Sequence, residues 1–416
     1  MSHVGATVRG DPEIAGIAER SAVIGFGVDD WTDTWQTRHQ FMSRLGARRW
    51  RVVYSTGALS VWQIGKPAWK AAPWRDRIQA TDNILVDQPG RLMPRWPSSP
   101  RWDRLAIRHR ARRLMRAVGW QDATHRIAYL FHPRFWPYVA HLGDCRVVFH
   151  IDDAFNHMPN WNDRLERAQA SLAARADLLI GTAPGMYRTL PAPAIDQVRE
   201  LPNAADADAF IAGRNAPCPD DLAAIPRPRI GYVGSINQKV DVRLIADTAA
   251  ARPDWHWVIV GPHAGDEARA DAAWAAGLEA CEASANVHFL GSKHHTELPA
   301  YTAHIDVNTM CYRTDGSGWW HVGYPLKLHE YLGAGQPIVS ADLETVRPFA
   351  AVVEIATGRD AWIAAIDRAL DKGEGGGEGG GGAGTLAERQ AVALQNTWDR
   401  RVDQLEQWLV EMLERG

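Results

Sequence analysis

Residues 319–340 read WWHVGYPLKLHEYLGAGQPIVS, and this stretch combines a glycine turn, a helix and a strand. Pro325 stands where a helix begins, since the first helical residue needs no N–H donor. The apolar residues that follow recur at helical spacing. Gly335 is placed to end that helix in the left-handed conformation, and PIVS (337–340) predicts a short buried strand. The whole stretch is therefore typical of an α/β protein.

A glycine turn that opens a helix is suited to bind phosphate, because free N–H groups and the helix dipole both point at the anion. We therefore predict a site for a nucleotide diphosphate, formed by Gly323, Tyr324, Pro325, Leu326 and Lys327. Glu330 lies further along the same helix, which rises about 1.5 Å per residue. Its carboxylate is placed there to accept hydrogen bonds from a ribose.

Length and composition indicate a globular protein of at least two domains. A chain of 416 residues exceeds what one core usually supports, and 46% hydrophobic with 23% charged residues is ordinary for a soluble protein. The cysteines show no CxxC pair and are interpreted as reduced thiols. The N-terminus lacks an apolar signal core, and no apolar run is long enough to span a bilayer. We expect a cytoplasmic protein.

Apolar runs alternate with helical patterns through the first half of the chain. SAVIGFG (21–27) and WRVVY (50–54) flank a helical pattern, and RIAYLF (126–131) and RVVF (146–149) follow. This order predicts a doubly wound parallel sheet. The first run ends in Gly-Phe-Gly, which is either a weak dinucleotide signal without its third glycine or a tight strand-to-helix turn.

Three titratable residues, His150, Asp152 and Asp153, follow the strand that ends at residue 149. In an open α/β sheet, residues just past the carboxyl end of a strand line the ligand crevice. We predict that His150 and Asp152 are catalytic. Asp153 either joins them or caps the next helix. His132 also ends a strand, where a loop role is favoured.

A second α/β repeat begins after a proline-rich linker. RIGYV (229–233) is followed by GSINQKVD, a glycine turn with a lysine before the next helix. Backbone donors at Gly234 and Ser235 are placed to cradle a diphosphate, and Lys239 to neutralise its charge. Lys239 is also predicted to be catalytic, because a fixed cation stabilises charge that develops on a leaving group. Asp241 either caps the following helix or orients Lys239.

The stretch Arg91–Trp120 is the most basic part of the chain and has helical spacing from Trp102 onward. One interpretation is a peripheral contact with anionic lipid headgroups or a lipid-linked acceptor at the inner face of a membrane. The other is a solvated helix whose arginines pair with acids elsewhere. Nucleic acid is a weaker interpretation of this stretch, because the whole chain is not basic, and we predict no nucleic-acid partner.

PLKLHEYLGAGQPIVS (325–340) resembles the donor-site segment of the large retaining glycosyltransferase family four, which has the GT-B fold. VVFHIDD (147–153) and RELPN (199–203) are similar to further family segments. The resemblance implies an α/β architecture of two Rossmann-like doubly wound domains that face each other across a cleft, with a C-terminal helix crossing back. It also implies that His150 faces the sugar, and that Asp152 matches a Val-Asp-Asp motif of relatives that make surface polysaccharides.

The activity implied by this resemblance is transfer of a sugar from a nucleotide-diphosphate sugar to a hydroxyl acceptor, in polysaccharide or glycoconjugate biosynthesis. Retention of configuration is implied, without a metal or other cofactor. Two departures stand out: Ser235 replaces a family arginine, and Val322 replaces a glutamate that holds the donor sugar. Inversion with Asp152 or Asp153 as base stays open. So do a nucleotide-sugar epimerase of the same fold and a non-catalytic nucleotide-sugar-binding protein.

The predicted organisation is a tail (1–20), an acceptor domain (21–208), a donor domain (209–372), a glycine-rich linker (373–384) and a C-terminal helix (385–416). Asp206-Ala207-Asp208 has the spacing of a metal-binding Asp-x-Asp. Its place after a Pro-Asn hinge favours helix capping instead, and we predict no metal site.

Overall fold

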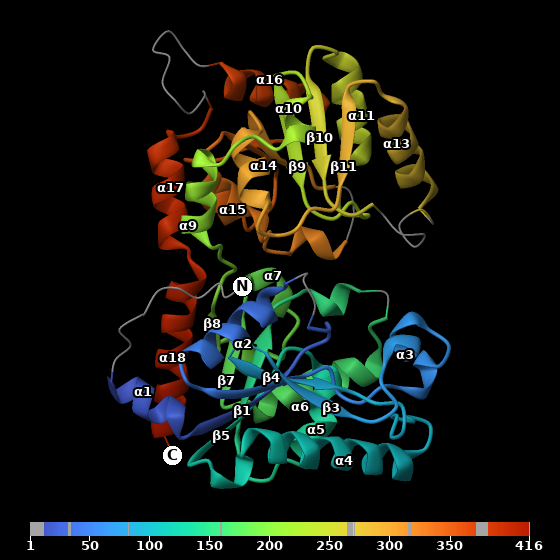
Figure 1. Ribbon diagram of the computed structural model, residues 1–416, viewed down its shortest axis with the longest axis vertical. Coiled ribbons are helices and arrows are strands. Elements are labelled where there is room, and N and C mark those ends of the chain that lie inside the picture. The colour runs from blue at the N-terminus through green and yellow to red at the C-terminus, as the bar shows by residue number, and fades with distance from the viewer. Residues whose placement is uncertain are drawn as a thin grey trace. The chain divides into compact units, whose positions relative to one another are not determined.

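The computed structural model describes residues 12–31, 35–81, 83–158, 160–263, 269, 271–314, 318–371 and 382–415. The chain divides into two compact units, Met1–Pro202 with Arg401–Gly416, and Asn203–Arg400. Each unit is a sheet with helices packed around it (Figure 1). Most of the predicted linker and of the predicted N-terminal tail lies outside the described residues.

The first unit is built on a sheet in the order β3-β4-β2-β1-β5-β6-β7-β8. All neighbouring strands are parallel except β3 and β4, which form an antiparallel pair at one edge. β1, β2, β5 and β6 follow the sequence prediction, whereas the β3–β4 pair and β8 were not predicted. The strands are β1 (Ser21–Phe26), β2 (Arg51–Ser55), β3 (Arg77–Thr81), β4 (Ile84–Gln88), β5 (His125–Leu130), β6 (Arg146–Ile151), β7 (Leu178–Gly181) and β8 (Val198–Glu200).

The glycines that end β1 are explained by packing. A side chain on Gly25 would collide with Met42, and one on Gly27 with the hydroxyl of Tyr54. Close packing therefore explains both glycines, but ten residues separate the end of β1 from the start of α2, so they do not form a tight strand-to-helix turn. The helices of this unit are α1 (Pro12–Glu19), α2 (Thr37–Ala47), α3 (Pro67–Ala71), α4 (Pro100–Val118), α5 (Trp136–Val139), α6 (Asp163–Arg175), α7 (Pro184–Tyr187) and α8 (Ala192–Ile195), with 3-10 turns at Val61–Gln63, Trp120–Asp122, Pro133–Phe135 and Phe155–His157.

The second unit has a fully parallel sheet in the order β11-β10-β9-β12-β13-β14. Counted from β9, this is the 3-2-1-4-5-6 order of nucleotide-binding doubly wound sheets, in which the crevice lies where the order reverses. That point is between β9 and β12. The strands are β9 (Arg229–Val233), β10 (His256–Val260), β11 (Val287–Gly291), β12 (Val307–Met310), β13 (Ile338–Ala341) and β14 (Glu354–Ala356).

The helices of the second unit enclose one continuous apolar core that includes Tyr232, Trp257, Leu328 and Trp362. Because strands and helices alternate, both faces of the sheet are covered, and every residue of β9 is buried. The helices are α9 (Ala207–Ala212), α10 (Asp220–Ala223), α11 (Val242–Ala251), α13 (Ala272–Ala283), α14 (Leu298–His304), α15 (Lys327–Ala334), α16 (Arg359–Leu370) and α17 (Leu386–Gln395), with 3-10 turns at Gly213–Asn215, Trp319–His321 and Arg347–Phe349.

The C-terminal segment is two helices and not the single predicted one. α17 ends before Asn396, and α18 (Trp398–Glu414) begins after a two-residue break. The side chain of Asn396 donates to the carbonyl of Val392 at 2.8 Å and so turns back on α17. The break lets α17 belong to the second unit while residues 401–416 return to the first.

α18 is held to the first unit by Glu406. Its carboxylate accepts a 2.7 Å hydrogen bond from the indole of Trp50 and forms a 2.7 Å ion pair with Arg48. Only 8% of the Glu406 side chain is exposed, so both contacts are shielded from solvent. On the same helix Glu411 pairs with Arg199 at 2.7 Å, but its side chain is 47% exposed.

We expect Glu406→Ala to lower the free energy of unfolding by about 2 kcal/mol, because it leaves the buried indole donor of Trp50 without its acceptor and removes one of the two carboxylates that pair with Arg48. Glu411→Ala is the matched control and should cost less than about 1 kcal/mol, since its pair is exposed. Urea titration of both variants measures the difference. Equal losses would contradict this account of how α18 is held.

Candidate functional site

The residues after β9 and before α15 meet at the point where the strand order of the second unit reverses. Gly234 directly follows β9 with φ of +148°, a region that favours glycine. A side chain at this position would collide with the ammonium group of Lys327. The glycine turn predicted after residue 233 therefore exists. It lies against Lys327, which belongs to the predicted segment 323–330.

Lys327 carries a buried amino group, and the residue is only 7% exposed. It opens α15, and its Nζ lies 3.5 Å from the ring centre of Tyr232 and 5.5 Å from that of Tyr312. Among the described residues its Nζ has no hydrogen-bond partner. The ring faces stabilise the charge by cation–π attraction, but buried ammonium groups normally also need acceptors.

Lys239 reaches the same tyrosine. Its Nζ lies 5.6 Å from the ring centre of Tyr312. The backbone places it there, because its carbonyl accepts from the amide of Arg313 at 2.8 Å, and the amide of Asp241 donates to the carbonyl of Cys311 at 2.8 Å. The structure therefore brings the two predicted lysines, from segments almost ninety residues apart, to one side chain.

Burial lowers the pKa of Lys327 well below its ordinary value, and the neighbouring Lys239 lowers it further. The thiol of Cys311 and the carboxyl of Glu330 oppose this shift. The two lysines repel each other where little water screens their charges. A polyanion that binds between them would reduce this repulsion. A diphosphate is such an anion, and it would restore the ordinary pKa of Lys327.

Glu330 lies one turn into α15 and is half-buried. Burial raises the pKa of its carboxyl to about 7, which Lys327 opposes and Asp206 reinforces. Because Lys327 is coupled to both Lys239 and Glu330, the structure gathers these three predicted residues around one spot. Their roles in binding stay a prediction.

The turn before α15 is fixed by hydrogen bonds from two sides. The side chain of Asn203 donates to the carbonyl of Tyr324 at 2.8 Å, and that of Thr345 to the carbonyl of Gly323 at 2.9 Å. The helix begins at Lys327, and not at Pro325 as the sequence suggested. The reason is local: Pro325 forms a turn whose carbonyl accepts from Leu328 at 3.2 Å.

The hydroxyl of Tyr331 fixes α15 against the end of β9. It accepts from the amide of Val233 at 2.8 Å and lies 3.2 Å from the carbonyl of the same residue. Helix and strand end are thus held in register, which keeps Lys327 beside Gly234. Leu326 precedes the helix as its N-cap and offers no side-chain cap, while Ser235 is exposed in the turn after β9.

A second group of titratable residues lies at the strand ends of the first unit. His150 is fully buried at the end of β6 and its Nδ1 lies 2.9 Å from the hydroxyl of Tyr129. Asp152 is also buried, with its Oδ1 3.5 Å from the guanidinium of Arg38. Arg38 in turn pairs with Asp29 at 2.7 Å.

Burial raises the pKa of Asp152 to about 7, an effect that Arg38 opposes and that Asp153 and Asp29 reinforce. Burial also lowers the pKa of His150 to about 3, with Arg38 adding to the shift. Within the described residues, Oδ2 of Asp152 and Nε2 of His150 have no hydrogen-bond partner. A carboxyl that has a pKa near 7 and one oxygen without a partner among the described residues is suited to exchange a proton or to bind a hydroxyl.

Local hydrogen bonds settle the alternatives for Asp241 and His132, whereas Asp153 does not cap the next 3-10 turn, whose N-cap is Ala154. Asp241 caps α11, since its carboxylate accepts from the amide of Leu244 at 2.9 Å. His132 has the loop role, because its Nδ1 accepts from the amide of Arg134 at 2.9 Å. Asp153 accepts from the amide of Ala154 at 2.8 Å, one residue before a 3-10 turn. Asp206 occupies the N-cap position of α9 but makes no side-chain cap bond.

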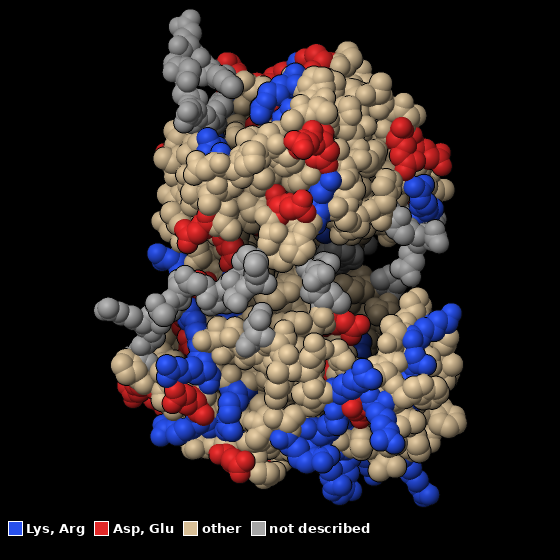
Figure 2. Space-filling model, viewed as in Figure 1, with Lys and Arg blue, Asp and Glu red and all other residues tan. Residues whose placement is uncertain are grey.

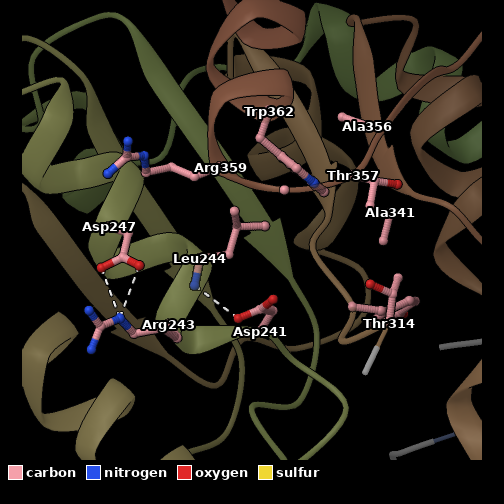
Figure 3. Close-up of a pocket in the computed structure, with 12 residues that line it drawn as sticks. Asp241, Arg243, Leu244, Asp247, Thr314, Ala341, Ala356, Thr357, Arg359 and Trp362 are labelled. Atoms are coloured by element: carbon pink, nitrogen blue, oxygen red, sulfur yellow. Dashed lines mark hydrogen bonds and ion pairs between the residues drawn. The ribbon is translucent and has the colours of Figure 1, made fainter. Parts of the chain in front are cut away.

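A separate cavity of about 190 Å³ lies between α11 and α16. Figure 3 shows that Arg243 and Asp247 of α11 bind each other and that Asp241 turns toward the amide of Leu244. None of the predicted site residues lines this cavity. It borders Tyr312 and Thr314 and is therefore a neighbour of the lysine site and not part of it.

In the part of the chain that the structure describes, no cluster of three His, Cys, Asp or Glu residues has the arrangement that holds a metal ion. None of its helices is both long and apolar enough to cross a bilayer.

Sequence reasoning missed Arg38, Tyr232 and Tyr312. Arg38 lies on α2, more than a hundred residues from the carboxyl that it contacts, and no local pattern marks it. The tyrosines occupy positions in and after buried strands, where an aromatic residue is ordinarily part of the core. Their place beside the two lysines follows only from the packing of β9, β12 and α15.

Comparison with known proteins gives a consistent result. Residues 227–372 match the family model described as Glycosyl transferases group 1. A protein named as a teichuronic acid biosynthesis glycosyltransferase, TuaH of Bacillus subtilis (strain 168), is 30% identical over 148 residues. That match covers 36% of this chain and 35% of the relative, so the chain spans about a third of the length of this relative.

Solved structures match over nearly the full chain. Sucrose-phosphate synthase from Thermosynechococcus elongatus has a TM-score of 0.67 at 14% identity and covers 95% of this chain and 99% of its own. Anabaena HepE in complex with UDP has a TM-score of 0.66 at 13% identity and covers 94% and 100%. At such identities the likeness shows the fold, and it confirms the predicted GT-B pair of Rossmann-like domains.

We expect Lys327→Met to raise the free energy of unfolding by about 1–3 kcal/mol, because it removes a buried charge that lacks an acceptor. The same change should weaken nucleoside diphosphate binding more than tenfold, since a charged hydrogen bond contributes about 1.5–3 kcal/mol. Urea titration and calorimetry with a panel of nucleoside diphosphates measure the two effects.

Lys293→Met is the matched control, because Lys293 pairs with Asp221 at 2.5 Å in the same unit. It should leave diphosphate binding unchanged. A Lys327→Met protein that binds diphosphates as tightly as the parent would show that Lys327 is only a packing residue.

Proposed function

We propose that this protein transfers a sugar from a nucleotide-diphosphate sugar to a hydroxyl acceptor. Its residues 227–372 match the group 1 glycosyl transferase model, and its fold is GT-B. The observation that carries this proposal is the Lys327–Lys239 pair at the strand reversal of the second unit. Structures of similar fold that are bound with UDP and with UDP-glucose support a nucleotide sugar as the donor.

The donor diphosphate docks at the start of α15 in this proposal. Lys327 approaches it from the helix and Lys239 from the loop after β9, while backbone amides of residues 323–327 complete the cradle. Lys327 thereby supplies the second positive charge, which the family places at the position of Ser235. Glu330 binds the ribose. These fixed charges stabilise the diphosphate as it leaves with its bonding electron pair, and electrostatic stabilisation of this kind often contributes most to catalysis.

This arrangement needs no metal ion to balance the charge of the leaving group, so we propose transfer without a metal or other cofactor. Retention of configuration is proposed on the family resemblance, supported by a neighbour of 13% identity whose description names glycosyl transfer with retention. His150 and Asp152 are proposed to contact the sugar and the acceptor. In a retaining reaction Asp152 orients the acceptor hydroxyl and does not take its proton.

The stereochemistry is decided by NMR of the anomeric proton in the product. The same anomer in donor and product supports the proposal. The opposite anomer would contradict retention and leave Asp152 or Asp153 as the general base, and loss of that base would then lower the rate by about 10²–10⁴.

A biosynthetic role in polysaccharide or glycoconjugate formation is proposed from the relative named for teichuronic acid biosynthesis. We also propose a cytoplasmic location. It is supported by the four free cysteines, of which Cys145, Cys281 and Cys311 are buried, since unpaired thiols persist in reducing compartments.

The test of the donor site is Glu330→Ala with Glu330→Gln as its conservative control. Glu330→Ala should raise the donor KM more than tenfold, because it removes hydrogen bonds to the ribose. Consumption of a nucleotide-sugar panel with simple sugar acceptors measures this. Unchanged transfer by Glu330→Ala would place the donor elsewhere, and an intact protein that consumes no nucleotide sugar would favour a non-catalytic binder.

The pH dependence of donor binding tests whether the carboxylate of Glu330 contacts the donor. Because its pKa is raised to about 7, the carboxyl gains a proton as pH falls through 7 and loses acceptor capacity. The ratio of donor KM between Glu330→Gln and the parent should therefore be largest above pH 7 and approach one below pH 6. A ratio independent of pH would contradict a ribose contact through the carboxylate.

A further inference from the structure

The large apolar side chains that the described residues expose are concentrated in one segment. Seven of them lie within residues 62–105, and Trp35 and Leu394 lie elsewhere. Trp74 is 70% exposed, Trp62 is 62% exposed and Ile64 is 60% exposed. Exposed tryptophans on this scale are unusual for a monomer surface and mark an interaction site.

Hydrogen bonds and ring contacts join the pieces of this segment into one surface. The amide of Val61 donates to the carbonyl of Arg95 at 2.9 Å, and the indole of Trp102 donates to the carbonyl of Pro94 at 2.8 Å. The guanidinium of Arg91 lies 5.3 Å from the ring centre of Trp74. We define the apolar-basic face as residues 61–75, 91–96 and the exposed side of α4. It lies beside the β3–β4 edge of the sheet (Figure 1).

α4 presents arginines outward along this face. Its inner side buries Ala106, Ile107, Ala111 and Leu114. Arg101, Arg104, Arg108 and Arg112 are exposed at spacings of three and four residues, which places them on one side of the helix. Figure 2 shows Lys and Arg gathered over this region of the first unit.

The acidic residues in and next to the apolar-basic face already pair with arginines of the same region. Residues 91–120 contain nine arginines and a single acid, Asp103, which pairs with Arg95 at 2.8 Å. Arg110 is buried and pairs with Asp76 at 2.7 Å and with Asp87 at 2.8 Å. The outward arginines therefore keep their charge toward solvent.

We propose that the apolar-basic face binds an anionic lipid bilayer, with its tryptophans at headgroup depth and the α4 arginines on lipid phosphates. Tryptophan is the residue that prefers the membrane–water interface, and arginines near an anionic surface attract it electrostatically. Apolar area beside positive charge fits a bilayer better than it fits nucleic acid, because the exposed tips include Ile64, Leu92 and Leu105, which neither stack on bases nor bind phosphate. The inference goes beyond the proposed function.

The test is co-sedimentation of the full chain with vesicles of phosphatidylcholine alone and of phosphatidylcholine mixed with phosphatidylglycerol. We expect binding to the mixed vesicles at low salt, and weaker binding as salt shortens the Debye length. The double variant Arg104→Ala/Arg108→Ala should lose roughly 30-fold in partitioning, or about 5-fold for each arginine removed. Trp62→Ala/Trp74→Ala should also lose binding, with a loss that depends less on salt.

The matched control is Arg164→Ala/Arg167→Ala, which removes two exposed arginines from α6 of the same unit. It should bind like the parent. Failure of the parent to bind mixed vesicles at low salt would overturn the proposal, as would equal losses in the control. A dimer in solution that Trp74→Ala dissociates would also overturn it, because the face would then be a self-contact. Sugar transfer is not needed for this readout, so failure of the proposed function is distinguishable from failure here.

Discussion

The charge of Lys327 constrains the candidate site more than any other feature of the second unit. A buried ammonium is unfavourable unless acceptors surround it, yet among the described residues this one has no hydrogen-bond partner. The faces of Tyr232 and Tyr312 contact it, and Lys239, Glu330 and Cys311 act on it only through longer-range electrostatics. The surroundings are built to keep it there. Gly234 leaves space for it, and Tyr331 holds its helix to β9. Such an unfavourable arrangement is expected to persist where an anion binds.

The first unit carries a carboxyl and an imidazole at its strand ends, where the second unit carries two lysines. Asp152 is a carboxyl whose pKa burial raises to about 7, partly offset by Arg38. His150 beside it is kept neutral by burial, which lowers its pKa to about 3. A neutral imidazole and a carboxyl that titrates near neutrality are suited to hydroxyl groups, whereas the lysine pair of the second unit is suited to phosphate. The two units therefore differ in the ligand chemistry that their strand ends favour.

Local sequence patterns predicted the strands that form the centres of both sheets, because buried parallel strands read as short apolar runs. They also predicted the left-handed end of α15 at Gly335 and the cap of α11 at Asp241. β3 was missed because its residues are largely exposed and carry no apolar run. β4 begins with the apolar residues Ile84, Leu85 and Val86 and is mostly buried, but this run of three is too short to be told from a loop by pattern alone. The break at Asn396 was missed because the helical pattern continues on both sides of it.

The sequence and its family resemblance predicted that Lys239 and the turn before the helix of Glu330 bind the same diphosphate, and the fold shows which contacts bring the two segments together. No pattern within either segment indicates that Lys327 points at Gly234, since this depends on the register of α15 against β9. The contribution of Tyr312 depends likewise on the loop after β12 crossing residues 237–241. Long-range packing of this kind is not encoded in spacing or composition.

The central claim is that the two lysines recognise a diphosphate. It is tested most directly by a series of ligands that differ only in their number of phosphate groups. Calorimetry on the unmodified chain would compare one nucleoside with its monophosphate and its diphosphate. The account predicts that affinity rises at least tenfold from the nucleoside to the diphosphate, because charged hydrogen bonds each contribute about 1.5–3 kcal/mol. Equal affinity for the nucleoside and its diphosphate would contradict it.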